Sequence, residues 1–208
     1  MSAFLGPIHH WLYHKIMVQE SLVQAILQYN EDKQYIVNLQ SQTDQQCGVI
    51  EQKPLEEIID GDNIHGWLQE RIHVVETRLS FVVTSLVKED AARMHDILNI
   101  AYEKGLEEFR AQKKDKESIH AVTIFQMLND MLLDGMPCDH INVQVSQSED
   151  EVVYRQTRCI HEEFWMEQGG LVMNYYDIRK KMIEGFLSET SFEFVIDEEN
   201  NYHIRRIA

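Results

Sequence analysis

Cysteines and basic residues are scarce in this chain, and each shortage excludes a class of protein. Only 3 of the 208 residues are cysteine, an odd and small number that does not suit the disulfide framework of a small secreted domain. Lys and Arg together number 19 against 35 Asp and Glu, which gives a net charge of -16. This charge disfavours binding to nucleic acid and to anionic membranes, because both attract clusters of basic residues.

Long apolar segments are also lacking. No apolar run has the roughly 20 residues that a membrane-spanning helix needs, and the first residues do not combine a basic stretch with an apolar one as a secretory signal does. We therefore expect a cytoplasmic protein that binds neither nucleic acid nor a membrane. With 44% hydrophobic residues, the chain has the composition of an ordinary globular protein.

Helix-breaking residues are rare in the first two thirds of the chain, where apolar residues recur at helical spacing. This pattern predicts helices over residues 8–29, 35–46, 64–88, 90–112 and 117–133. After Pro137, alternating apolar residues predict strands over residues 141–145, 152–157, 191–196 and 202–207, with helices over residues 162–168 and 175–187. The sequence therefore predicts an α+β protein, with an all-α helical bundle over residues 1–135 and a small antiparallel sheet with helices over residues 136–208.

An internal repeat organises the predicted bundle. Residues 8–27 match residues 64–83 at an offset of 56 positions. The matched pairs are Ile8/Ile64, His9/His65, Trp11/Trp67, Leu12/Leu68, Lys15/Arg71, Ile16/Ile72, Val18/Val74, Glu20/Glu76 and Ser21/Thr77. Two of the 3 tryptophans fall in equivalent positions, so chance does not account for the match. We infer a duplicated helix, in which Trp11 and Trp67 are candidates to line a ligand pocket.

Each copy of the repeat places a histidine and a glutamate on the stripe that its apolar residues bury. A carboxylate removed from water is costly unless it is paired, so Glu20 and Glu76 require partners, and the repeat predicts equivalent surroundings for them. If the helices pack antiparallel, each Glu faces a His; if they pack parallel, the two Glu meet and His9 meets His65. These residues are therefore candidate ligands for a divalent metal.

Two further interpretations of the repeat stay open. Pairing with a nearby basic residue such as Lys15 would satisfy the buried carboxylates without any ligand. Alternatively, Glu70-x-x-His73 and Glu117-x-x-His120 match part of the signature of a carboxylate-bridged dimetal bundle, which would bind iron.

A second group of candidate ligands flanks the first predicted hairpin, as Cys138-Asp-His140 and Cys159-Ile-His161. If the turn lies near Ser148, Cys138 pairs opposite Cys159, and strand alternation places the histidines on the same face. Two thiolates and two imidazoles can hold zinc in a tetrahedral site. Cys159 could instead be a nucleophile that a neighbouring histidine activates.

The last quarter of the chain carries a further pattern, in which a strand ends in Arg-Cys, a short helix follows, and an Asp lies in the next helical segment. The residues concerned are Tyr154–Cys159, Glu163–Trp165, Tyr176–Asp177, Gly185–Phe186 and Phe192–Phe194. In this order of features the chain resembles the L-2-amino-thiazoline-4-carboxylate hydrolase family and related small-molecule-binding α+β domains. The resemblance implies a hydrolase-like pocket that uses Cys159 and Asp177, while residues 199–203 lack the cysteine that such domains usually have in a later turn.

Two functions from different classes follow from these patterns. As an enzyme, the protein would hydrolyse a small molecule, with Cys159 as nucleophile or metal ligand, His161 or His140 as the base, and Asp177 as the orienting carboxylate. As a non-catalytic sensor or carrier, it would hold a small-molecule ligand or a divalent metal, zinc or iron, between the repeat helices. A homo-oligomer is compatible with either function.

Overall fold

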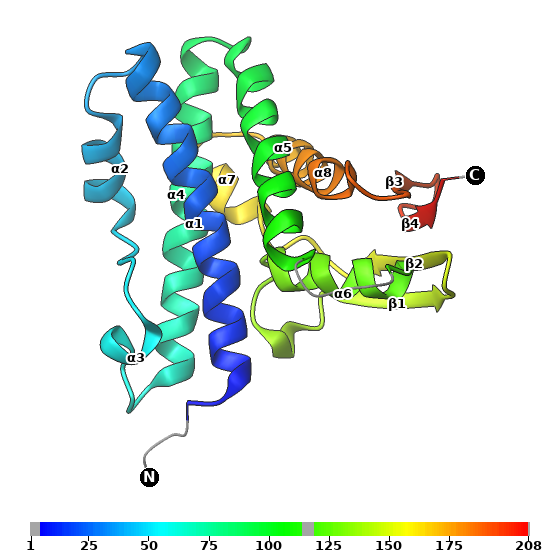
Figure 1. Ribbon diagram of the computed structural model, residues 1–208. Coiled ribbons are helices and arrows are strands. Elements are labelled where there is room, and N and C mark those ends of the chain that lie inside the picture. The colour runs from blue at the N-terminus through cyan, green and yellow to red at the C-terminus, as the bar shows by residue number, and fades with distance from the viewer. Residues whose placement is uncertain (1–4, 114–118, 208) are drawn as a thin grey trace.

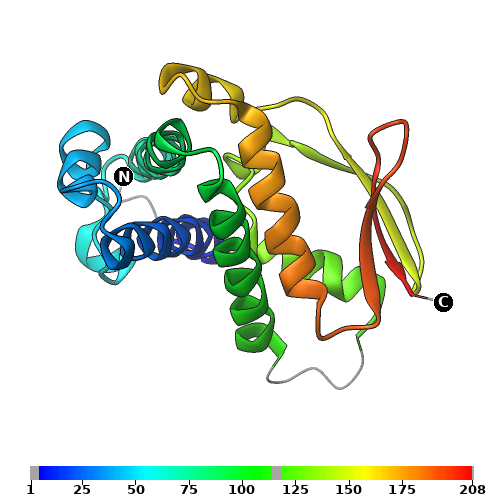
Figure 2. The same cartoon turned by 90° about the horizontal axis from the view of Figure 1, so that it is seen from above.

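The computed structural model describes residues 5–113 and 119–207, and it has the predicted α+β fold. Helices form one side of the molecule and a four-stranded antiparallel sheet forms the other, with α8 between them (Figures 1 and 2). In chain order the elements are α1 (Pro7–Lys33), α2 (Leu39–Cys47), α3 (Leu55–Ile58), α4 (Ile64–Glu89), α5 (Arg93–Gln112), α6 (Ala121–Met131), β1 (Asn142–Gln147), β2 (Glu151–Gln156), α7 (Glu162–Glu167), α8 (Val172–Leu187), β3 (Phe192–Ile196) and β4 (Tyr202–Arg206).

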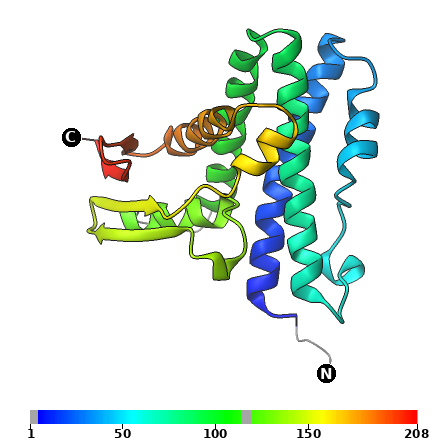
Figure 3. The ribbon, with the colours of Figure 1, turned by 180° about the vertical axis from the view of Figure 1, so that it is seen from behind.

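The two copies of the repeat form the long helices α1 and α4. They lie side by side and run in the same direction, as Figures 1 and 3 show from opposite sides. The chain returns from the end of α1 to the start of α4 through α2 and α3. At the start of α4 the Asn63 side chain accepts a hydrogen bond from the backbone N–H of Gly66 (3.2 Å), which satisfies one of the free donors of the first turn. The packing that the sequence left open is therefore parallel.

Helices α5 and α8 cross closely because each has a glycine at the contact. A Cβ atom at Gly105 would lie 1.9 Å from the backbone oxygen of Met182, and one at Gly185 would lie 1.9 Å from the backbone oxygen of Tyr102. A backbone oxygen cannot move aside as a flexible side chain can, so any larger residue would force the helices apart. This crossing fixes the position of the sheet relative to the helical bundle.

The sheet has the strand order β1-β2-β4-β3, and every neighbouring pair is antiparallel. Helices α6 and α8 cover one face of it (Figure 2). The buried side chains of that face include Val152 and Tyr154 of β2, Phe192 of β3 and Ile204 of β4. Strand β1 lies at one edge, and its residues after Asn142 are exposed. In β2, β3 and β4 the apolar residues therefore mark the face turned toward the helices, whereas Val143 and Val145 of β1 are exposed.

Buried apolar side chains form two clusters. The larger one contains residues of α1, α4, α5, α6, α8 and the sheet, so it extends through both halves of the chain. The smaller one lies mainly around the N-terminal halves of α1 and α4. Buried polar side chains, including Lys15, Glu20, Glu76 and Arg78, lie near the positions where the two helices pass from one cluster to the other.

Two predictions about the helices can be compared with the structure. The helix predicted over residues 117–133 begins at Ala121 among the described residues, and the predicted residues 117 and 118 lie outside the described part. Within residues 5–113 and 119–207, no helix is both long enough and apolar enough to cross a membrane.

Candidate functional site

Five buried side chains from distant parts of the chain lie together beside α1, α4 and α8. Lys15 comes from α1, Glu76 from α4, Asp134 from the connection after α6, His161 from the residue before α7, and Arg179 from α8. Each is more than nine-tenths buried, and we call these residues the buried polar cluster. Because little water reaches them, their charges require partners within the protein or on a ligand.

Asp134 and Arg179 form the central ion pair of the cluster. Arg179 Nη1 lies 2.9 Å from Asp134 Oδ1, and Arg179 Nη2 donates to Oδ2 at 3.0 Å. The side-chain amides of Asn142 and Gln156 also donate to this carboxylate, at 2.7 and 3.1 Å. Burial raises the pKa of Asp134, but the attraction of Arg179 and its hydrogen bond outweigh burial and hold the pKa below its ordinary value. Asp134 is therefore ionised, and its acceptor capacity is largely used.

Lys15 is the cation of the cluster that has no hydrogen-bond or ion-pair partner among the described residues. Its amine lies 4.0 Å from the centre of the Trp11 ring, and no hydrogen bond or ion pair joins it to any other described residue. Burial lowers the pKa of Lys15 from its ordinary value of 10.5 to about 8, against the attraction of Asp134. Near pH 8 the amine thus exists in both its charged and its neutral form.

Lys15 borders a pocket of about 160 Å³, which we call the Lys15 pocket. Its walls come from α1, from α6 and from the segment that leads into β1. They consist of Trp11, Lys15, Asn129, Asp134, Gly135, Met136, Pro137, His140, Ile141 and Asn142. The pocket therefore combines an apolar wall with a buried cation and an amide, as small-molecule sites commonly do.

A second buried ion pair lies further along α1 and α4. The Glu20 carboxylate accepts two hydrogen bonds from Arg78, each 3.0 Å long. Arg78 also donates to the Asp44 carboxylate at 2.7 Å and to the backbone oxygen of Gly48. Burial lowers the pKa of Arg78, but Glu20 and Asp44 together raise it above its ordinary value. Arg78 thus ties α1 and the end of α2 to α4, which is a structural role.

Glu76 occupies the equivalent position in the second copy of the repeat but has a different partner. Its carboxylate lies 3.1 Å from Nδ1 of His161, so the two Glu do not meet as one site. The prediction of equivalent surroundings for Glu20 and Glu76 is wrong. The physical reason is that Arg78 has no counterpart in the first copy, where the corresponding residue is Leu22.

The two histidines of the repeat do meet, at the N-terminal ends of α1 and α4. Nε2 of His9 lies 3.3 Å from Nε2 of His65. Nδ1 of His9 accepts a hydrogen bond from the backbone N–H of Gly6 (3.0 Å), so in the neutral ring the proton is on Nε2. A metal would need the lone pair of that Nε2 atom. This tautomer therefore favours a hydrogen bond between the rings over shared metal ligation.

The cysteines predicted as zinc ligands lie apart from the core. Cys138 belongs to a short 3-10 helix (Pro137–Asp139), and the pairing of β1 with β2 starts only at Asn142. The predicted strand pairing of Cys138 with Cys159 is therefore wrong. Its physical reason is the left-handed backbone of His140 (φ 48°), which interrupts the extended chain before β1. Within the described ranges, no three His, Cys, Asp or Glu side chains converge as a metal site requires.

Other residues of the predicted metal and cofactor sites contact neighbouring side chains. Trp67 lies beside Arg71, whose guanidinium carbon is 5.5 Å from the ring centre, and Arg71 pairs with Glu70 at 2.8 Å. The ring of His73 packs on an aromatic ring of α7 rather than facing another ligand. Glu117, the remaining carboxylate of the predicted dimetal motif, lies outside the described residues.

Two of the predicted catalytic residues lie at the surface, and the third is buried. Cys159 and Asp177 are exposed, whereas His161 is only 1% exposed and its Nδ1 faces Glu76. The ring of His161 also stacks on Tyr175, with the ring centres 3.7 Å apart. The structure thus brings His161 into the buried polar cluster and leaves the other two at the surface.

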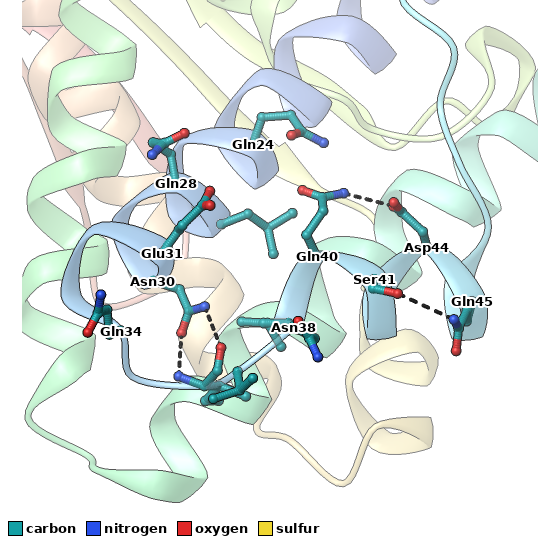
Figure 4. A pocket seen from close by; sticks show the side chains of 14 residues that line it. Gln24, Gln28, Asn30, Glu31, Gln34, Asn38, Gln40, Ser41, Asp44 and Gln45 are labelled. Atoms are coloured by element: carbon teal, nitrogen blue, oxygen red, sulfur yellow. Dashed lines mark hydrogen bonds between the residues drawn. The ribbon is translucent and has the colours of Figure 1, made fainter.

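A hollow of about 920 Å³, larger than the Lys15 pocket, lies between the end of α1 and α2 (Figure 4). Many of its lining side chains are amides, and Figure 4 shows that several are bonded to neighbours on the same segment. Gln40 donates to Asp44 at 2.9 Å, and Asn30 bonds both backbone groups of Ile36 at 2.9 Å. Because these amides already have partners, the hollow makes a weaker case for a specific site than the Lys15 pocket.

Sequence reasoning missed most of the Lys15 pocket and of the buried polar cluster. Asp134, Arg179 and Asn142 gave no local signal, because their roles depend on contacts between distant segments. The sequence did contain one signal for Lys15. In both copies of the repeat a cation follows a tryptophan by four positions, as Lys15 follows Trp11 and Arg71 follows Trp67.

We compared the chain with models of protein families, with curated proteins and with solved structures, and none of these comparisons gave a match.

Proposed function

We propose that this protein binds a small anionic ligand in the Lys15 pocket, with the ligand's negative group on the amine of Lys15. One observation carries the proposal: Lys15 is 3% exposed and lines the pocket, and its amine has no hydrogen-bond or ion-pair partner among the described residues. A buried ammonium without a partner destabilises a fold. An anion at this position would supply the missing partner.

The size of the pocket limits the ligand to a small molecule. Its volume of about 160 Å³ is below the roughly 300 Å³ at which pockets for drug-sized ligands begin. Trp11, Met136 and Ile141 offer apolar contacts for a short hydrocarbon part. A short-chain carboxylate has the charge and the size that these walls accept.

We propose ligand binding for this protein, and not hydrolysis. A hydrolase of the expected kind needs a nucleophile, a base and an orienting carboxylate within hydrogen-bond reach of one another. Cys159 and Asp177 are exposed, whereas His161 is buried with its Nδ1 atom against Glu76. A sensor or carrier is therefore the better supported of the two functions.

Calorimetric titration with propionate tests the proposal. We expect binding to the wild-type protein, and a loss of at least about tenfold in affinity for Lys15→Met, because a hydrogen bond to a charged group contributes about 1.5–3 kcal/mol. Met has a similar length and suits a buried position, so the variant should fold. Lys33→Met, which changes an exposed lysine of the same helix, should bind as the wild type does. Equal affinities for the wild type and Lys15→Met, or no binding to the wild type, would contradict the proposal.

A further inference from the structure

The amine of Lys15 is enclosed by the protein yet keeps a small accessible surface. The whole residue is only 3% exposed, and no hydrogen bond or ion pair joins its amine to another described residue. The amine nitrogen is nevertheless not one of the described polar atoms that are both fully buried and unpaired. Part of the remaining exposure of Lys15 therefore belongs to the nitrogen itself, and Lys15 and Trp11, whose ring centre is 4.0 Å from the amine, both line the Lys15 pocket.

The surroundings of this amine favour its neutral form more than water does. Asp134, the carboxylate of the pocket lining, is already paired with Arg179, and the indole N–H of Trp11 donates to Asp130 at 2.8 Å. Burial lowers the pKa of Lys15 from 10.5 to about 8. At pH 7 about one amine in ten is then neutral, against about one in 3,000 for an amine with a pKa of 10.5. A neutral lysine amine is a nucleophile that forms imines with carbonyl compounds, whereas an ammonium group is not.

We propose that Lys15 captures small 2-oxo carboxylates covalently, by forming an imine with their carbonyl carbon. This inference rests on the proposed function and names the class of ligand and its bond to the protein. The nitrogen of the neutral amine attacks the carbonyl carbon, and the carbonyl oxygen leaves as water with the two hydrogens of the amine. The step therefore consumes no oxidant or reductant.

The carboxylate of a 2-oxo acid suits the pocket before and after this reaction. Before it, the negative charge is attracted to the fraction of Lys15 that is still an ammonium group. After it, a protonated imine keeps a positive charge on the buried nitrogen, and the carboxylate, bonded to the imine carbon, stays beside that charge. A neutral aldehyde would leave the same charge buried without a partner, which is costly.

Reductive labelling with pyruvate tests the inference on the wild-type protein. Cyanoborohydride reduces an imine to a stable secondary amine, and peptide mass spectrometry locates the modified lysines. At pH 7 we expect Lys15 to be labelled at least about tenfold faster than Lys33, an exposed lysine of the same helix, because much more of the Lys15 amine is neutral. Equal initial rates at the two lysines would overturn the inference.

Propanal separates the effect of the carboxylate from that of the amine, because it has the same chain length as pyruvate and no charge. The ratio of Lys15 to Lys33 labelling is compared, since the intrinsic reactivity of a probe affects both lysines. We expect this ratio to be about tenfold larger for pyruvate, in line with the contribution of pairing to a charged group. An equal or larger ratio for propanal would overturn the assignment to 2-oxo carboxylates.

Labelling in guanidinium chloride is the control for the fold. In the unfolded chain Lys15 and Lys33 should react with pyruvate at similar rates, because the pocket no longer exists. A preference for Lys15 that persists after unfolding would show that the local sequence causes it, and would overturn the role of the pocket.

The outcomes separate this inference from the proposed function. Preferential labelling of Lys15 by pyruvate that excess propionate slows would support both. If propionate binds but pyruvate labels Lys15 no faster than Lys33, the imine is refuted while the proposed function stands. If propionate does not bind and pyruvate labels the two lysines equally, both fail.

Discussion

Replacing Glu20 with Gln should lower the free energy of unfolding by about 3–5 kcal/mol, the usual range when one partner of a buried ion pair is removed. Arg78 is 1% exposed and bonds both oxygens of Glu20. A glutamine keeps the shape of the side chain but removes one of the two carboxylate charges that pair with this buried guanidinium, the other being that of Asp44. Denaturation with urea at pH 7 measures the loss.

Glu76→Gln is the matched control, because it makes the same chemical change at the equivalent position of the repeat. A glutamine oxygen can still accept a hydrogen bond from the His161 ring, so we expect a loss of only about 1 kcal/mol. Equal losses for the two variants would contradict the structural account and would favour the symmetric surroundings that the repeat suggested.

Replacing Lys15 with Met should stabilise the protein at pH 7, by up to roughly 3 kcal/mol. The estimate follows from the pKa of Lys15, which burial lowers from 10.5 to about 8, at about 1.36 kcal/mol per pH unit. An increase in stability on removal of a charged residue is typical of positions kept for binding rather than for folding. Urea denaturation of the two proteins measures it, and a variant less stable than the wild type at pH 7 would count against this account.

The difference in stability between Lys15→Met and the wild type should decrease as the pH rises above 8. Below pH 8, Lys15 is charged in both the folded and the unfolded protein, so the full cost of burying the charge is present. Between pH 8 and 10.5 the folded protein releases the proton before the unfolded chain does, so wild-type stability rises relative to the variant. The advantage of Lys15→Met should thus shrink toward pH 10.5, whereas a constant advantage would exclude titration of Lys15 as its cause.

The repeat helices show which parts of the fold a sequence can predict. Their apolar stripe and the Asn63 cap are local signals, so the range predicted for the second helix, residues 64–88, is within one residue of α4 (Ile64–Glu89). The direction of packing is not local, because the long connection through α2 and α3 allows either direction. The close crossing at Gly105 and Gly185 could not be predicted from the sequence either, since the two glycines are 80 positions apart and neither lies in a recognisable motif.

The candidate site was harder to predict than the fold. The sequence showed that buried polar residues occur on α1 and α4, but it gave them a symmetric arrangement. That symmetry fails because single positions differ between the copies: Lys15 is buried against Trp11, whereas Arg71 pairs with the exposed Glu70. One-residue differences of this kind decide a site, while they leave the helical pattern unchanged.

The hairpin illustrates a different limit. The alternating residues correctly predicted β1 and β2, and extending the same alternation by a few residues placed Cys138 on a strand. The backbone leaves the extended conformation at His140, which no polar or apolar pattern signals. Errors of this size matter little to a fold but change which side chains can meet in a site.

The most direct test of the central claim is an NMR titration of the Lys15 side chain, assigned by comparison with Lys15→Met. The account predicts that Lys15 titrates at about 8 in the free protein and at a higher pH when propionate is bound, because an adjacent anion stabilises the charged amine. A Lys15 that titrates with the exposed lysines, or whose titration propionate does not change, would contradict the assignment of this pocket as the binding site.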